Sequence, residues 1–344
     1  MRVLVTGGTG FTGAALVRRL LGAGHEVVAL DRKPGIRLDE LRAAGADVRL
    51  ESVTDARTVD EAMRGVEVVH HVAAAFRETD QPDEYFYHVN VTGTRMVLEA
   101  AVRHGVRMFV HCSTCGVHGD VEAPPANEDA PIKPADYYQE TKWLGELVVR
   151  EFADRGLSTV ILRPNALYGP GDPGRYLMLF RQVAKGWFPM FGPGEALYHP
   201  LFIENFVDAM MLATEESVEG GGTYLIADQS CCTIEHLVRK VGGALGIHVK
   251  IIRLPLRPLI LLGHLVEAAC KPLRVEPPLF PRRVDWFRQN RCFDIGRARC
   301  ELGYVPRIGL EDGLALTGRW YAQHGYLGAF RMPPAPSTGS AEGL

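Results

Sequence analysis

The stretch TGGTGFTG, residues 6–13, decides the fold class of this chain. It follows an apolar, strand-like run and opens a segment whose apolar residues recur with helical spacing. Gly8, Gly10 and Gly13 satisfy G-x-G-x-x-G, and Gly7 replaces Gly8 in the related G-x-x-G-x-x-G spacing. Missing side chains allow a tight turn and a close approach of the backbone to a pyrophosphate. The free N–H groups of the helix N-terminus would then face the phosphates.

An acidic residue at the end of the second strand-like run completes this motif. Asp31 ends the run 26–31 and lies 18 residues after Gly13, close to the offset at which an acid binds the adenosine ribose. Its carboxylate would accept from a 2′-hydroxyl and repel a 2′-phosphate, which favours NAD over NADP. Arg32 and Lys33 follow directly and could bind that phosphate, so NADP is the less favoured alternative.

Strand-like and helical segments alternate along most of the chain. This alternation predicts an α/β fold, a doubly wound parallel sheet of the Rossmann type with about seven strands and helices on both faces. The expected strands are 3–7, 26–31, 47–52, 66–74, 106–114, 158–164 and 223–228. The principal expected helices are 15–24, 38–45, 90–105 and 137–156.

The composition of the sequence changes after the sixth expected strand, where Gly- and Pro-rich loops become frequent. We assign residues 1–165 to a dinucleotide-binding domain, rejoined by about 200–230. Residues 166–199 and 231–331 are expected to form a smaller C-terminal, substrate-binding lobe. The tail 332–344 is small, polar and proline-bearing, and we expect it to be disordered.

Composition argues against several classes of protein. The 344 residues are 47% hydrophobic and 23% charged, as in ordinary globular proteins, and the net charge of −3 gives no footprint for nucleic acid. The seven cysteines lack a repeating spacing, which predicts reduced thiols in a cytoplasmic protein. No signal peptide is indicated at the start of the chain. Cys112 and Cys115 spell C-x-x-C, but the second pair of a zinc site is missing, so no metal is expected.

The segment 254–270 is strongly apolar. Its longest run without a formal charge, residues 258–266, falls short of the roughly 20 residues of a membrane-spanning helix. A buried or lobe-lining helix is the favoured interpretation. Contact with a membrane surface is a weaker alternative.

A tyrosine and a lysine lie one helical turn apart in DYYQETKWLGE, residues 136–146. Residues four apart share a helix face, so Lys142 can stand beside Tyr138. A neighbouring ammonium favours phenolate and lowers the pKa of a tyrosine. The pair therefore predicts a tyrosine that moves a proton to or from a substrate hydroxyl while hydride is transferred.

Several motifs follow one another in a characteristic order: TGGTGFTG, HHVAA (70–74), HVNVTGT (88–94), VHCSTCGVHG (110–119), YQETK (138–142) and LRPNALYGPGD (162–172). Together they resemble the extended short-chain dehydrogenase/reductase superfamily, including its NAD-dependent epimerase/dehydratase family, over most of residues 1–330. The resemblance implies that Tyr138 is the catalytic acid/base, that Lys142 binds the nicotinamide ribose, and that the protein forms a homodimer.

The resemblance also implies a Ser or Thr that polarises the substrate oxygen, four residues before the Tyr of a VYG element. Here that element reads VHG (117–119), so His118 replaces the tyrosine. Counting back gives Thr114 as the third catalytic residue, with Ser113 as the second choice.

Cofactor contacts are implied at further positions. Ala73 and Ala74 match the small residues that let the cofactor lie over the fourth strand. Ser52 and Val53 fall where an Asp-aliphatic pair of the family often meets adenine. Pro164 and Leu167 fall where the backbone usually meets the nicotinamide amide. Ser52 departs from the usual Asp. The expected set is Gly7, Gly10, Phe11, Thr12, Gly13, Asp31, Arg32, Ser52, Val53, Ala73, Ala74, Tyr138, Lys142, Pro164 and Leu167.

Two branches of the superfamily fit the substrate region. Members acting on nucleotide sugars often carry an Arg-Asp pair and an RPGD element that bind pyrophosphate. The matching places here have His199 without an Arg, and Arg291 without the RPGD. Because bidentate Arg is the natural phosphate ligand, we favour a 3β-hydroxysteroid dehydrogenase-like enzyme over a nucleotide-sugar epimerase or dehydratase with tightly bound NAD. Substrate contacts are expected from Ser113, Asn165, His199 and Arg291.

A protein that binds the dinucleotide only as a sensor is the third alternative. Such proteins usually lose the Tyr or the Lys, and this chain keeps both. We therefore expect an enzyme.

Overall fold

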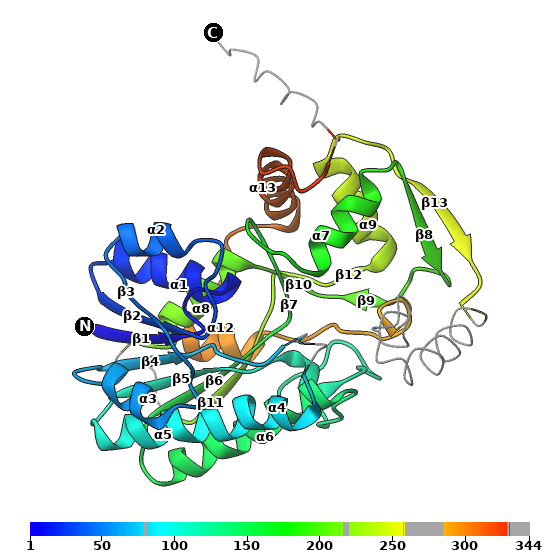
Figure 1. Cartoon of the computed structure of the whole chain (residues 1–344). Helices are drawn as coiled ribbons and strands as arrows, with labels where there is room; N and C mark the ends of the chain where they lie inside the picture. The colour runs from blue at the N-terminus through cyan, green and yellow to red at the C-terminus, as the bar shows by residue number, and fades with distance from the viewer. Residues whose placement is uncertain are drawn as a thin grey trace, which may run out of the picture.

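The computed structural model describes residues 1–76, 78, 81–215, 220–256, 258, 285–328 and 330. Its centre is a seven-stranded sheet in the order β11-β6-β5-β4-β1-β2-β3, with every neighbouring pair parallel (Figure 1). This confirms the predicted doubly wound α/β fold. The strands are β1 (Arg2–Thr6), β2 (Glu26–Asp31), β3 (Asp47–Leu50), β4 (Val68–His71), β5 (Met108–Cys112), β6 (Thr159–Pro164) and β11 (Gly222–Ile226).

Helices cover both faces of this sheet. One layer contains α1 (Phe11–Gly22), α2 (Leu38–Ala43) and α8 (Ile203–Leu212), and the other contains α3 (Ala56–Ala62), α5 (Thr94–Arg103) and α6 (Tyr137–Asp154) (Figure 1). Successive strand residues point to opposite faces, so each strand feeds two cores. In β1, Val3 and Val5 join one hydrophobic cluster and Leu4 joins the other.

Two helix starts explain how the motifs are placed. Helix α1 begins at Phe11, earlier than its apolar spacing indicated, because its first turn includes the motif residues Phe11, Thr12 and Gly13, which lie before the run with helical spacing. Helix α6 begins at Tyr137, where the Asp136 side chain accepts a hydrogen bond from the Gln139 N–H at 2.9 Å. This N-cap satisfies a backbone donor at the helix start and fixes where the tyrosine pair lies.

The segment expected as one helix over 90–105 is divided. A π-helical turn, η1 (His88–Gly93), joins α4 (Asp83–Tyr87) to α5. Such turns widen the backbone and often occur at functional sites. Here the turn carries Asn90.

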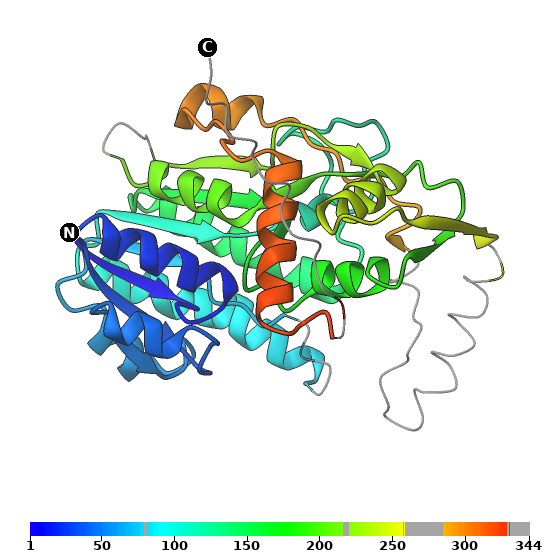
Figure 2. The same cartoon turned by 90° about the horizontal axis from the view of Figure 1, so that it is seen from above.

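Most of the remaining elements lie beyond the carboxyl ends of the large sheet (Figure 2), whereas α12 (Gly296–Leu302) packs beside β11. Helices α7, α9 and α13 pack together, and three two-stranded sheets pair β10 with β7, β12 with β9, and β13 with β8. The helices are α7 (Arg175–Val183), α9 (Ile234–Ala244), α12 (Gly296–Leu302) and α13 (Leu310–Gln323), and η2 (Cys115–His118) is a 3-10 turn. The short strands are β7 (Ala166–Tyr168), β8 (Trp187–Phe191), β9 (Leu197–Tyr198), β10 (Pro200–Phe202), β12 (Cys232–Thr233) and β13 (Lys250–Leu254).

Two sequence predictions fall largely outside the described residues: the disordered tail 332–344 and most of the apolar segment 254–270. Within the part of the chain that is described, no helix has the length and apolar character needed to cross a bilayer.

The prediction that all cysteines are reduced thiols is wrong for one pair. Cys231, in the loop after β11, and Cys292 form a disulfide with a Cα–Cα distance of 5.6 Å. The two residues are 61 positions apart, so their proximity depends on tertiary structure and not on sequence spacing. Among the described cysteines, Cys112, Cys115, Cys232 and Cys300 are free thiols.

Candidate active site

The glycine motif forms the tight turn that its sequence predicts. Gly7 has a left-handed φ of +68°, and a Cβ at Gly13 would lie 2.0 Å from the Gly7 carbonyl oxygen. Neither position can carry a side chain without displacing the backbone. A Cβ at Gly10 would meet only one atom within 3.4 Å, so the space next to this residue is open. Phe11 and Thr12, both half-buried, begin the helix that follows.

Asp31 fastens the end of β2 to this turn. Its Oδ2 accepts from the N–H groups of Thr9 and Gly10, both at 3.1 Å, and from Thr9 Oγ1 at 2.9 Å. The only described contact of Oδ1 is a long 3.4 Å bond from the Lys33 N–H. The carboxylate is therefore held in place with one oxygen still able to accept from a ribose hydroxyl.

The two basic residues after Asp31 are bound to an acid. Arg32 Nη2 lies 2.7 Å from Glu78 Oε2, and Lys33 Nζ lies 3.3 Å from the same oxygen. The Arg32 guanidinium also lies 5.3 Å from the centre of the Tyr85 ring. A 2′-phosphate would have to compete with Glu78 for both cations, so this arrangement fits NAD better than NADP.

The most informative feature of the site is the burial of the Lys142 side chain. It lies one turn after Tyr138 on α6 and is only 1% exposed. Burial lowers its pKa, while Cys112 and Glu146 act in the opposite direction. No hydrogen bond or ion pair reaches Nζ from the described residues. A buried ammonium without an acid partner is costly, and ribose hydroxyls would supply acceptors for it.

The Thr114 hydroxyl has a hydrogen that it can donate. Thr114 is the N-cap of η2, and its Oγ1 accepts from the Gly116 N–H at 3.0 Å. Since this contact uses a lone pair, the hydroxyl hydrogen is left to donate. Ser113 is different: it is 3% exposed and its hydroxyl donates to Glu146 Oε1. This geometry does not support the prediction that Ser113 contacts substrate.

Sequence reasoning missed a buried charged network beneath these residues. Arg163, the last residue of β6 before Pro164, donates from Nε and Nη2 to the two oxygens of Glu146 at 2.9 and 2.7 Å. Its Nη1 lies 2.9 Å from His118 Nε2, and His118 Nδ1 lies 3.2 Å from the Pro131 carbonyl oxygen. Burial and Arg163 lower the pKa of His118, so its ring is neutral and accepts from Arg163. An Arg inside an otherwise apolar strand was the available signal, because a buried charge needs a partner.

A second buried chain of hydrogen bonds supports the loop after β4. The Ala73 N–H donates to Thr6 Oγ1 at 3.2 Å, and Thr6 Oγ1 lies 2.8 Å from His71 Nδ1. His71 Nε2 lies 3.0 Å from Thr94 Oγ1, which donates to the Asn90 carbonyl oxygen at 2.7 Å. Because Thr94 uses its hydrogen on Asn90, His71 must donate from Nε2 and accept at Nδ1. Burial lowers the pKa of His71 to about 3, which agrees with a neutral ring.

The other expected cofactor contacts line the same edge of the sheet or lie near it. Ala73 and Ala74 follow β4 and are half-buried, and Val53 is buried after β3. The Ser52 hydroxyl is occupied locally, 2.8 Å from Thr54 Oγ1. Pro164 ends β6, and Leu167 lies in the short strand β7.

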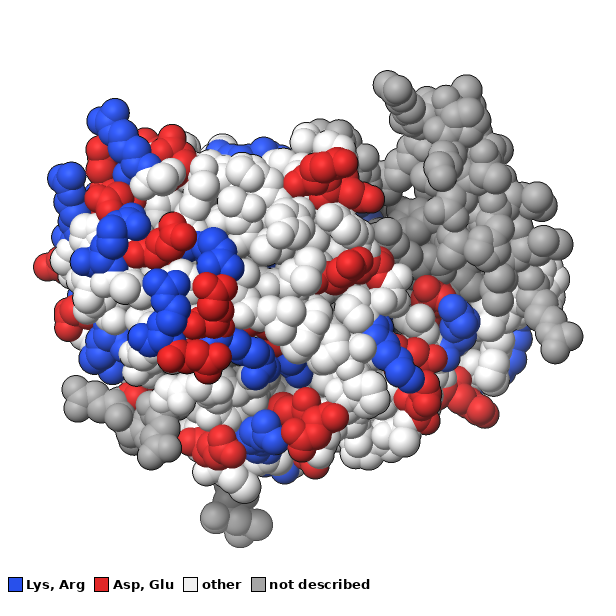
Figure 3. Space-filling view, turned by 90° about the horizontal axis from the view of Figure 1, so that it is seen from below, with Lys and Arg blue, Asp and Glu red and all other residues white. Residues whose placement is uncertain are grey.

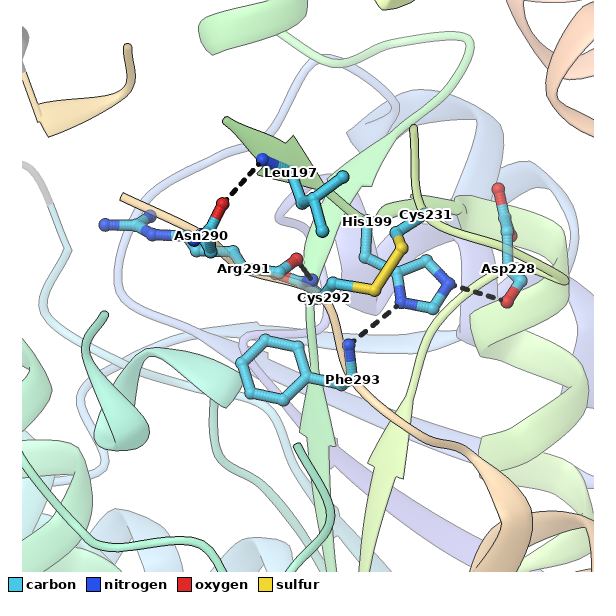
Figure 4. The surroundings of a disulfide bond; sticks show 9 residues. Leu197, His199, Asp228, Cys231, Asn290, Arg291, Cys292 and Phe293 are labelled. Atoms are coloured by element: carbon cyan, nitrogen blue, oxygen red, sulfur yellow. Dashed lines mark hydrogen bonds between the residues drawn. A yellow bond between two sulfur atoms is a disulfide. The ribbon is translucent and has the colours of Figure 1, made fainter. Parts of the chain in front are cut away.

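Two of the expected substrate residues, His199 and Arg291, lie near the disulfide (Figure 4). The Arg291 N–H donates to the Leu197 carbonyl oxygen at 2.7 Å, and Asn165 Nδ2 donates to the Arg291 carbonyl oxygen at 3.2 Å. His199 is buried, with Nε2 2.9 Å from the Asp228 carbonyl oxygen and Nδ1 accepting from the Phe293 N–H at 3.3 Å. Both of its ring nitrogens therefore bind backbone, and this geometry does not support a substrate contact by His199.

A Rossmann sheet with an open glycine turn, an acid at the end of β2 and a Tyr-Lys pair on α6 defines a dinucleotide-dependent enzyme. The chain belongs to the NAD-dependent epimerase/dehydratase family, whose model matches residues 3–227. It is an enzyme whose cofactor is NAD.

Relatives of the chain include enzymes with different reactions. It is 33% identical to sterol demethylase protein B of Methylococcus capsulatus, over 95% of this chain and 100% of the relative. It is 31% identical to UDP-glucose 4-epimerase of Mycolicibacterium smegmatis, over 93% of this chain and 98% of the relative. A crystal structure of dTDP-glucose 4,6-dehydratase from Streptomyces venezuelae, with NAD bound, has a TM-score of 0.75 and 27% identity, covering 94% of this chain and 98% of that one.

Proposed function

We propose that this enzyme is a 3β-hydroxysteroid dehydrogenase-like oxidoreductase that oxidises a secondary alcohol to a ketone, or catalyses the reverse reaction, on an apolar, sterol-like substrate. The observation that carries the chemistry is the buried Lys142, without an acid partner among the described residues, one turn from Tyr138. Bound NAD supplies the hydride acceptor.

Each residue of the Tyr-Lys-Thr set has a role in this proposal. The Lys142 ammonium stabilises Tyr138 as a phenolate, and this phenolate takes the proton of the substrate hydroxyl and becomes a phenol while hydride passes to NAD. Lys142 also donates to the hydroxyls of the nicotinamide ribose. Thr114 donates to the substrate oxygen and fixes its position relative to Tyr138.

Two observations support an apolar substrate. The relative from Methylococcus capsulatus is a sterol demethylase protein. The first five residues after β4 are apolar (Val72, Ala73, Ala74, Ala75 and Phe76), and the last of them contacts Tyr138. A polyhydroxylated sugar would find no side-chain hydrogen-bond partner on these residues.

A nucleotide-sugar epimerase is the second candidate, supported by the similarity to UDP-glucose 4-epimerase. The decisive experiment incubates the purified protein with NAD and either a 3β-hydroxysterol or UDP-glucose, and measures reduced nicotinamide by absorbance and products by chromatography. Net formation of NADH with the sterol supports the proposal. Conversion of UDP-glucose to its epimer without net NADH, by protein that retains its NAD through gel filtration, would replace it.

We further propose a homodimer formed through α5 and α6. On the face that these helices cover, acidic and basic side chains are interspersed with uncharged surface (Figure 3). Leu147 of α6 and Val102 of α5 are exposed apolar residues, and Leu144 and Val148 pack closer to the core. Light scattering should give twice the monomer mass, and Leu147→Glu should give the monomer mass. A monomeric parent protein would exclude the dimer.

The expected cytoplasmic location stays a prediction.

A further inference from the structure

Phe76 contacts the proposed acid/base directly. Its ring centroid lies 4.8 Å from that of Tyr138, with an interplanar angle of 51°. Such a separation and tilt are those of a favourable aromatic pair. Even so, the Phe76 residue is 49% exposed, so about half of its surface is open to solvent.

The position of Phe76 is fixed by its neighbour in the chain. Asn90 Oδ1 accepts from the Ala75 N–H at 2.8 Å, and Asn90 Nδ2 donates to the Ala75 carbonyl oxygen at 3.2 Å. The same Nδ2 donates to Thr141 Oγ1 at 2.9 Å, and Thr141 Oγ1 donates to the Tyr138 carbonyl oxygen at 2.9 Å. One buried amide thus holds both the loop that carries Phe76 and the helical turn that carries Tyr138.

This arrangement puts an apolar surface beside the reacting atoms. Binding sites with well-defined selectivity combine apolar walls with a few polar groups that fix orientation. Here Tyr138 and Thr114 are the polar groups, and the exposed part of the Phe76 ring is an apolar wall next to them. A ring system whose hydroxyl reaches Tyr138 would lie against Phe76 with the carbons that flank the reacting carbon.

We propose that Phe76 is a specificity-determining residue that selects fused-ring, sterol-like alcohols and ketones by contact with the substrate ring that carries the oxygen. This inference rests on the proposed function. Phe76 takes no part in the proton transfer, so its removal should change which substrate is preferred more than it changes the chemistry at Tyr138.

The test compares two substrates on three variants. Initial rates of NADH formation give kcat/KM for a 3β-hydroxysterol and for 2-propanol, which presents a secondary alcohol without any ring. Phe76→Ala removes the wall, and Phe76→Leu restores an apolar side chain. Tyr87→Ala is the control, because Tyr87 is an aromatic residue of α4 with similar exposure, 45%.

Phe76→Ala should lower kcat/KM for the sterol by roughly tenfold or more, mostly through KM, which is the scale of a lost aromatic contact. Its kcat/KM for 2-propanol and its NAD affinity should stay near the parent values. Phe76→Leu should recover part of the loss, and Tyr87→Ala should behave like the parent protein.

An unchanged preference for the sterol in Phe76→Ala would overturn the inference while leaving the proposed function standing. An equal loss on both substrates would also overturn it, because that result assigns Phe76 to the placement of Tyr138. A parent protein that converts UDP-glucose and neither alcohol would instead reject the proposed function, before any variant is considered.

Discussion

Arg163 and Glu146 form a bidentate ion pair in which both side chains are almost completely shielded from solvent, with 2% and 0% exposure. The pair joins β6 to α6, and Ser113 at the end of β5 adds a hydrogen bond to the same carboxylate. Lys142 lies one turn before Glu146, Thr114 follows Ser113, and Pro164 follows Arg163. The ion pair therefore fixes the three elements that carry the proposed catalytic and cofactor residues.

Removing one partner of this pair should destabilise the protein strongly. Glu146→Gln leaves the Arg163 guanidinium buried without a counter-charge, and a loss of about 3–5 kcal/mol in the free energy of unfolding is expected. Urea denaturation followed by circular dichroism measures it. The control is Glu151→Gln, which removes the partner of Arg95 in an exposed pair between α5 and α6 and should cost at most ~1 kcal/mol. Equal, small losses in both variants would show that the buried pair is not required for stability.

A feature of the fold or of the site could be predicted from the sequence where the residues that form it lie close together in the chain. The glycine turn, Asp31 and the Tyr138–Lys142 pair are set by spacing within one strand-turn-helix unit or one helical turn, so the sequence predicts them. The Arg163–Glu146 pair joins a strand to a helix, and only the unusual Arg in an apolar strand hinted at it. The disulfide and the backbone partners of His199 bring together segments far apart in the chain, and no spacing rule connects them.

Three substitutions should separate the roles in the proposed chemistry. Tyr138→Phe removes only a hydroxyl, so NAD binding should persist while hydride transfer in a single turnover falls by about 10²–10⁴-fold or more. Lys142→Met should reduce both the rate and NAD affinity, because the ammonium acts on Tyr138 and on the ribose. Thr114→Ala should cost less than Tyr138→Phe. Tyr137→Phe, one position out of register, is the control and should transfer hydride like the parent. A Tyr138→Phe variant within a few-fold of the parent would contradict the assignment.

The choice between NAD and NADP should depend on Asp31 and Glu78. Calorimetric titration of the parent should show tighter binding of NADH than of NADPH. Glu78→Gln removes the acid that binds Arg32 and Lys33, so NADPH affinity should rise while NADH affinity changes little. Asp31→Ala should further reduce the preference for NADH over NADPH, although it also removes the acceptor of the Thr9 and Gly10 N–H groups. A parent protein that binds NADPH as tightly as NADH would refute this account.

The disulfide can be counted chemically. The chain has seven cysteines, and one disulfide leaves 7 − 2 = 5 thiols, so titration of the denatured, unreduced protein should find five. Closing a loop with a sequence separation of 61 should stabilise the fold by about 4 kcal/mol in the chain-entropy model. Replacing both Cys231 and Cys292 by Ser should therefore lower the free energy of unfolding toward that extent. Cys300→Ser, at an exposed free thiol, is the matched control. Seven titratable thiols would show that the pair is reduced in the isolated protein.

Asp228 should make the protein less stable as pH rises from about 4 toward neutrality. Burial raises the pKa of this carboxyl to about 7, against hydrogen bonds from Asn205 and the Phe202 N–H that act in the opposite direction. Between about pH 4 and pH 7 the folded protein then holds a proton that the unfolded chain has released, so stability falls as pH rises through this window. The limiting loss is roughly 4 kcal/mol, since one pKa unit is worth about 1.36 kcal/mol.

Buried histidines act in the opposite direction over part of this range. Burial lowers the pKa of His71 to about 3 and that of His199 to about 4, so their contribution to stability is lost as pH falls below about 6.5. The measurement therefore compares two proteins: thermal unfolding of the parent and of Asp228→Asn, from pH 5 to pH 8.5, gives the difference between their stabilities at each pH. The Asn side chain keeps a carbonyl acceptor for Asn205 and Phe202 and has no charge to bury. Its stability relative to the parent should rise with pH up to about pH 8 and then level. Asp129→Asn, at an exposed carboxylate, should show no such trend, and a pH-independent difference for Asp228→Asn would show that the carboxyl titrates normally.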